Sequence, residues 1–85
     1  MTEFCYTIKD ELGIHARPAG MLVKEADKFK SEILIHLNDN QADAKRIFSI
    51  MALGVKCGDK LRITASGEDE EKAKEIMENF FKANL

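Results

Sequence analysis

His15 is the residue of this sequence best suited to chemistry, because it lies in the run Gly13-Ile14-His15-Ala16-Arg17-Pro18-Ala19. Pro18 has no backbone N–H and is tolerated in a helix only within the first turn, which predicts a helix that begins near His15 or Ala16. The N-terminus of a helix, which we call its mouth, carries unpaired backbone N–H groups and a partial positive charge. We therefore expect His15 at the cap position, next to an anion-binding site.

A neutral imidazole at this position is a candidate nucleophile, since the lone pair of its unprotonated nitrogen can attack phosphorus. The backbone N–H groups of Ala16 and Arg17, together with the Arg17 guanidinium, would hold the phosphoryl oxygens. This chemistry requires neither a metal nor another cofactor. The simpler alternative, in which His15 only caps the helix, stays open on the local pattern.

The other residues that could do chemistry have no partners at a useful spacing. His36 falls in a predicted strand, where we expect an ordinary exposed histidine, and two isolated histidines do not make a metal site. Cys5 and Cys57 form no CxxC motif, so we expect reduced thiols, with Cys5 buried in a strand. Gly54 and Gly58 are read as turn glycines, because no phosphate-binding glycine motif is present.

Size and composition limit the class of protein. The chain has 85 residues, of which 45% are hydrophobic and 33% charged, and this predicts one compact domain over residues 1–85 with a surface site. The net charge of −2 argues against nucleic-acid binding. No apolar run approaches the ~18 residues of a membrane span, and no leader pattern precedes the first strand. We expect a cytoplasmic protein that does not insert into membranes.

Hydrophobic periodicity predicts the element order βαββαβα. Alternation indicates strands near residues 4–8, 33–37, 41–44 and 61–65, with a turn at 38–40. Helical spacing indicates a first helix from residue 16, a short one from 47 to a stop at 54, and a last one that opens at 69–71. The four strands need cover on one apolar face, so the fold class is α+β, with two layers and one open sheet face.

The short second helix has more apolar residues than one face can bury; they are Ile47, Phe48, Ile50 and Met51. Phe48 is the one we expect to be exposed. An exposed aromatic side chain beside a flexible methionine forms a docking patch. The basic residues expected around this patch are Lys24, Lys45 and Arg46, and they would favour acidic partners. The alternative is that Phe48 packs on a neighbouring side chain.

The run 13–19 resembles the active-site signature of the histidine-containing phosphocarrier (HPr) family of the bacterial phosphoenolpyruvate-dependent sugar phosphotransferase system. Residues 45–54 resemble the second-helix segment of that family, and residues 66–70 resemble one of its turns. The chain length and the element order also agree. The resemblance implies an open-faced β-sandwich, in which three helices cover one face of a four-stranded antiparallel sheet.

The resemblance also implies a function. His15 would accept a phosphoryl group on Nδ1 from phosphorylated Enzyme I and pass it to the IIA domain of a sugar permease, and Arg17 would contact the phosphate. The residues that fall where the family docks its partners are Gly20, Ile47, Phe48 and Met51. Such a protein is a carrier rather than an enzyme with a small substrate, and we expect a monomer.

Arg46 departs from the family pattern. Many relatives from low-GC Gram-positive bacteria have a serine at this position, which a dedicated kinase phosphorylates. Arg46 has no hydroxyl group, and its positive charge is opposite to that of the regulatory phosphate. Ser49 lies three residues further on and is not the matching residue.

Three alternatives are kept open. The chain could be a specialised phosphocarrier, for a nitrogen-regulatory branch or a dihydroxyacetone kinase relay. The βαββαβ order also suits small acyl-phosphate hydrolases, although no general base accompanies His15. A pure interaction module, with His15 as a helix cap, is the third.

Overall fold

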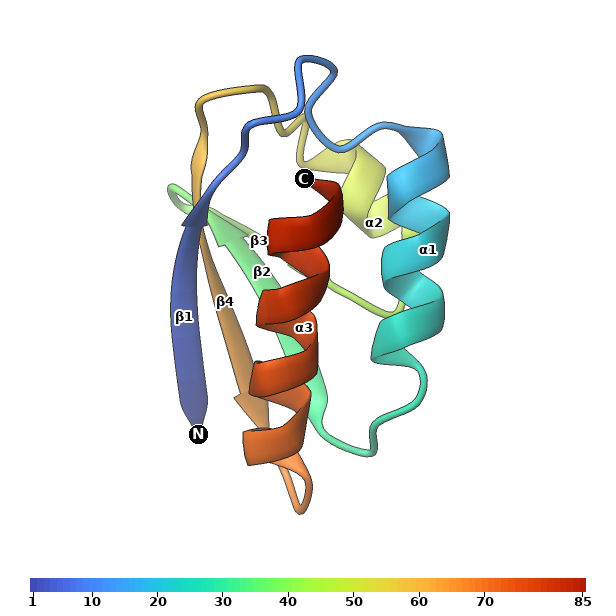
Figure 1. Cartoon of the computed structure of the whole chain (residues 1–85), viewed down its shortest axis with the longest axis vertical. Helices are drawn as coiled ribbons and strands as arrows, with labels where there is room; N and C mark the ends of the chain where they lie inside the picture. Colours follow the sequence, from blue (N-terminus) through green and yellow to red (C-terminus); the bar gives the residue numbers. More distant parts are fainter.

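The computed structural model describes residues 1–85 and shows a four-stranded sheet with three helices on one face (Figure 1). The strands are β1 (Thr2–Thr7), β2 (Glu32–Leu37), β3 (Asn40–Asp43) and β4 (Lys60–Ser66). The helices are α1 (Ala16–Ala26), α2 (Ile47–Ala52) and α3 (Glu70–Asn84). The predicted element order is confirmed, and the ends of the elements differ by a few residues. None of the helices is long and apolar enough to span a bilayer.

The sheet is antiparallel throughout, with the strand order β1-β4-β2-β3. Its register places Phe4 opposite Ile63, Ile63 opposite Ile35, and Ile35 opposite Ala42. These four side chains are buried, so they form one apolar row across the face that the helices cover. The period-two alternation of the strands is thus satisfied on a single face.

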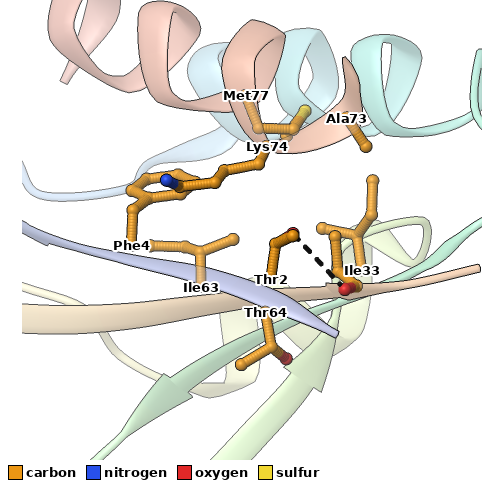
Figure 2. A pocket seen from close by; sticks show the side chains of 9 residues that line it. Thr2, Phe4, Ile33, Ile63, Thr64, Ala73, Lys74 and Met77 are labelled. Carbon is orange, nitrogen blue, oxygen red and sulfur yellow. Dashed lines mark hydrogen bonds between the residues drawn. The ribbon is translucent and has the colours of Figure 1, made fainter. Parts of the chain in front are cut away.

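Helix α3 packs on this row over β1 and β4 (Figure 2). Met77 of the helix and Phe4 and Ile63 of the sheet line one narrow space, which is too small for a water molecule. At the edge of this region the Thr2 hydroxyl donates a hydrogen bond to the Ala65 carbonyl oxygen at 3.5 Å. The region is therefore packed core rather than a binding cavity.

The prediction that Cys5 is buried is wrong, since its thiol is exposed. Successive side chains of a strand point to opposite faces, and Phe4 and Tyr6 take the helix-covered side of β1. Cys5 is therefore on the open face, opposite Arg62 of β4. Cys57 is also exposed and free.

His36 lies on the open face as expected, but the prediction of an ordinary exposed side chain is wrong. The ring is partly buried, and its Nε2 is 3.0 Å from the Thr64 hydroxyl. Burial lowers the pKa of His36 from its ordinary value of 6.5, and the charge of Arg62 lowers it further. The neighbouring strands crowd this position, which the alternation of β2 alone does not reveal.

Candidate functional site

The loop before α1 is held in place by Gly13. This residue has φ +67°, and its N–H donates to the Asp10 carbonyl oxygen at 2.9 Å. A β-carbon added at Gly13 would lie 2.1 Å from the Val55 carbonyl oxygen. Only glycine satisfies both the left-handed conformation and this close approach. The glycine of the 13–19 run thus sets the path by which the chain enters α1.

His15 occupies the cap position of α1, as predicted. Its backbone is extended, with φ −96° and ψ −178°, and its carbonyl oxygen accepts the Ala19 N–H at 3.0 Å. The imidazole makes no capping hydrogen bond and keeps 38% of its surface exposed. Because only the backbone of His15 caps the helix, its ring is available to a partner molecule.

The mouth of α1 offers an anion two backbone donors. The N–H groups of Ala16 and Arg17 have no hydrogen-bond partner within the chain, and the first turn contains no acidic residue. Arg17 is exposed and lines the same shallow depression as His15, with a volume of about 220 Å³. The Arg17 side chain and His15 therefore line one surface depression, next to the free N–H groups at the start of α1.

Asp10 is the site residue that sequence reasoning missed. Its Oδ2 lies 3.8 Å from Nε2 of His15, and its Oδ1 accepts the Leu12 N–H at 2.9 Å. Aspartate at the first position of a turn and glycine at the fourth are typical of a type I turn. The spacing of Asp10 and Gly13 thus signalled a turn, but not that the carboxylate would face His15.

The C-terminal end of α3 holds this loop in place through hydrogen bonds. The carbonyl oxygen of Leu85 accepts the N–H groups of Lys9 and Asp10 at 2.6 and 2.9 Å, and the Leu85 side chain is buried. Asn84 lines the depression beside His15. Figure 1 shows the last turn of α3 close to the loop that joins β1 to α1. Residues from both ends of the chain therefore build one site.

Helix α2 exposes Phe48, the residue that the sequence predicts to be exposed. Phe48 is 86% exposed and Met51 is 40% exposed, whereas Ile50 is fully buried. Ile47 is partly buried and faces α1, where a β-carbon on Gly20 would lie 3.9 Å from its Cδ1. The small residue on α1 thus lets the two helices pack closely beneath the exposed side chains.

The basic residues near α2 behave differently from one another. Lys45 does not rim the patch as expected, because its ammonium donates to the Phe29 carbonyl oxygen at 2.7 Å. Arg46 is exposed and lies 3.9 Å from the Asp43 carboxylate. Lys24, in the last turn of α1, is exposed. Lys24 and Arg46 therefore remain as the exposed cations of the predicted rim.

Exposed apolar side chains cluster in the segments around His15. Apart from Met1, the exposed large hydrophobic residues are Leu12, Met21, Phe48 and Met51, which we call the apolar patch. They belong to the loop before α1, to α1 and to α2, and Met21 also lines the depression of His15. Patches of this kind mark sites of protein interaction. Leu12 and Met21 were not predicted, since isolated apolar residues in a sequence give no sign of exposure.

The fold and the site together define an open-faced sandwich domain with a solvent-accessible histidine at the mouth of its first helix. A family model described as "PTS HPr component phosphorylation site" matches residues 2–83. The chain belongs to the HPr family of the phosphotransferase system.

Individual relatives agree with this assignment. The chain is 44% identical over 73 residues to the phosphocarrier protein HPr of Mycoplasma capricolum, which is 86% of this chain and 82% of that protein. The structure of HPr-C-His from Thermoanaerobacter tengcongensis matches with a TM-score of 0.93 at 37% identity, over 98% of this chain and 93% of that one. An HPr dimer from the same organism matches with a TM-score of 0.77 at 37% identity, over 98% and 95%. The predicted open-faced sandwich is thereby confirmed.

Proposed function

We propose that this chain carries a phosphoryl group on His15 from phosphorylated Enzyme I to IIA domains of sugar permeases. One observation carries the proposal: the His15 ring is exposed and uncapped at a helix mouth whose Ala16 and Arg17 N–H groups have no other partner. Such a ring can take up a phosphoryl group and release it again, because neither step requires the site to open.

In the proposed transfer the Nδ1 lone pair of neutral His15 attacks the phosphorus of an N-phosphorylated histidine on the donor. A new P–N bond forms as the old one breaks, and the bonding pair returns to the donor imidazole. The N–H groups of Ala16 and Arg17 and the Arg17 guanidinium stabilise the equatorial oxygens. The same step in the opposite direction passes the group to the acceptor, so no metal or other cofactor takes part.

The donor and the acceptor dock on the same surface. It comprises Gly20, Lys24, Ile47, Phe48 and Met51, and the apolar patch adds Leu12 and Met21. A largely exposed aromatic ring gains much from burial at an interface, which makes Phe48 the expected anchor. Because both partners need this surface, they bind in turn. We propose that the carrier acts as a monomer in the cytoplasm.

We further propose that the serine-directed regulation of many relatives does not act on this chain. Arg46, which stands at the matching position, is exposed at the start of α2 and carries no hydroxyl group. Incubation with ATP and the serine-specific kinase of a Gram-positive relative is expected to add no phosphoryl group to the chain. Stoichiometric phosphorylation of Ser49 under these conditions would contradict this proposal.

The relay is tested by incubating the chain with Enzyme I and phosphoenolpyruvate and measuring its intact mass. We expect one acid-labile phosphoryl group, and its loss when a IIA domain is added. A chain that gains none contradicts the proposal. Steady release of phosphate from acetyl phosphate by the chain alone would favour the hydrolase instead.

A further inference from the structure

Asp10 is fixed by three hydrogen bonds that leave one carboxylate oxygen uncommitted. Its N–H donates to Leu85, its carbonyl oxygen accepts the Gly13 N–H, and its Oδ1 accepts the Leu12 N–H, each at 2.9 Å. Its Oδ2 takes part in none of these bonds and lies 3.8 Å from Nε2 of His15. The loop therefore presents a negatively charged acceptor to one particular nitrogen of the ring.

No other group that lines the depression can replace this acceptor. Arg17 offers only donors. The Asn84 amide donates its own N–H to the Phe80 carbonyl oxygen at 3.0 Å, and an amide oxygen carries no net charge. Asp10 supplies the only carboxylate in the depression.

We propose that Asp10 is a positioning residue that holds the His15 proton on Nε2 and so leaves the lone pair on Nδ1. This proposal rests on the proposed function, and it identifies Asp10 as the group that selects Nδ1 of His15 as the reacting nitrogen. A carboxylate beside one imidazole nitrogen favours the tautomer with the proton on that nitrogen.

The proton stays on Nε2 throughout the transfer. The P–N bond to Nδ1 forms as the donor's P–N bond breaks, and the His15 ring becomes a positively charged, N-phosphorylated imidazolium. Asp10 then faces this positive ring from the Nε2 side, while the helix mouth and Arg17 hold the phosphoryl oxygens. No base needs to remove a proton, which agrees with the absence of any second titratable acceptor in the depression.

Asp10→Asn provides a sharp test. The amide oxygen of asparagine can still accept the Leu12 N–H, and its NH₂ group then faces Nε2 as a donor. The preferred tautomer should therefore shift toward the proton on Nδ1. Asp39→Asn, at the exposed turn between β2 and β3, makes the same charge change away from the site and serves as the control.

The tautomer is read from ¹⁵N chemical shifts of the full chain with labelled histidine, at a pH where the ring is neutral. We expect the Nε2–H form of His15 to predominate in the parent chain and in Asp39→Asn, and to decline in Asp10→Asn. The His36 signals should stay unchanged and serve as an internal reference. Phosphorylation by Enzyme I should slow about two- to fivefold in Asp10→Asn, the range for a solvent-accessible ion pair.

Two outcomes would overturn the role of Asp10: an unchanged tautomer ratio in Asp10→Asn, or slower phosphorylation without a tautomer shift. A urea unfolding curve close to that of the parent confirms that the variant is folded. If the parent chain itself gains no phosphoryl group from Enzyme I, the proposed function fails. The ¹⁵N spectra would still decide whether Asp10 sets the tautomer.

Discussion

The Asp69 carboxylate, at the start of α3, accepts hydrogen bonds from both the hydroxyl and the backbone N–H of Ser31, which lies 38 residues earlier. It also accepts the Lys30 N–H at 2.9 Å. Gly67, with φ +149°, packs so closely that an added β-carbon would lie 2.8 Å from Ser31. These contacts join the loop after α1 to the turn before α3, at the end of the molecule opposite the start of α1 (Figure 1).

The hydrogen bond from Ser31 should be detectable as a lowered pKa of the Asp69 carboxyl group. The Ser31 hydroxyl, followed by the Lys30 N–H, lowers the pKa of Asp69 from 3.8 to about 2. A lowered carboxyl pKa stabilises the fold above the unfolded value, and this contribution is lost as the pH falls from about 4 through 2. In Ser31→Ala the Asp69 pKa should rise toward 3.8, as followed by carboxyl carbon NMR. Ser66→Ala, at an exposed serine, is the control, and an unchanged Asp69 pKa in Ser31→Ala would refute the assignment.

Gly13 and Gly54 differ in a way that predicts unequal costs of substitution. Both have positive φ, +67° and +65°, but only Gly13 lies against backbone. Gly54→Ala should lose about 1 kcal/mol of the free energy of unfolding, from left-handed strain alone. Gly13→Ala should lose roughly 2 kcal/mol more, because Val55 must move. Urea unfolding measures both values, and equal losses would show that the contact with Val55 does not constrain the loop.

Arg17 should affect phosphorylation without affecting folding. Arg17→Ala removes an exposed side chain that we propose contacts the phosphoryl oxygens, so the rate of phosphorylation by Enzyme I should fall about 100-fold. Arg17→Lys should recover only part of this loss, because an ammonium cannot bind two oxygens in the fork geometry of arginine. As a control, the Arg62→Ala variant, which is changed on the open sheet face, should be phosphorylated by Enzyme I at the rate of the parent chain. A full rate in Arg17→Ala would remove Arg17 from the site.

Phe48 and its buried neighbour Ile50 should have opposite effects. Phe48→Ala should change the free energy of unfolding by no more than about 0.5 kcal/mol, because the ring is 86% exposed. It should raise the KM of Enzyme I for the carrier roughly tenfold. Ile50→Val should cost about 1 kcal/mol of stability and leave KM unchanged, since Ile50 is fully buried. An unchanged KM in Phe48→Ala would exclude Phe48 as the docking anchor.

Local patterns in the sequence were sufficient to predict the elements and the position of His15 at the start of α1. The alternation around Phe4 and Ile35 marks strands, and Pro18 is compatible with a helix only near its start, which places His15 at the mouth. The exposure of Phe48 followed from the excess of apolar residues in a short helix. These features depend on neighbours within one or two turns, and the sequence displays such neighbours directly.

The predictions that failed depend on contacts between distant segments. Cys5 was expected inside because free cysteines usually are, but the register with β4 puts it on the open face. His36 bonds to Thr64, and Lys45 to Phe29, across 28 and 16 residues. The loop that carries Asp10 is hydrogen-bonded to Leu85, at the other end of the chain. No periodicity within one segment encodes such pairs.

We propose that His15, and not His36, is the histidine that carries the phosphoryl group. The most direct test of this proposal is the intact mass of the parent chain, His15→Ala and His36→Ala after incubation with Enzyme I and phosphoenolpyruvate, before and after acid treatment. We predict one acid-labile phosphoryl group on the parent and on His36→Ala, and none on His15→Ala. A phosphoryl group on His15→Ala equal to that of the parent would contradict the account.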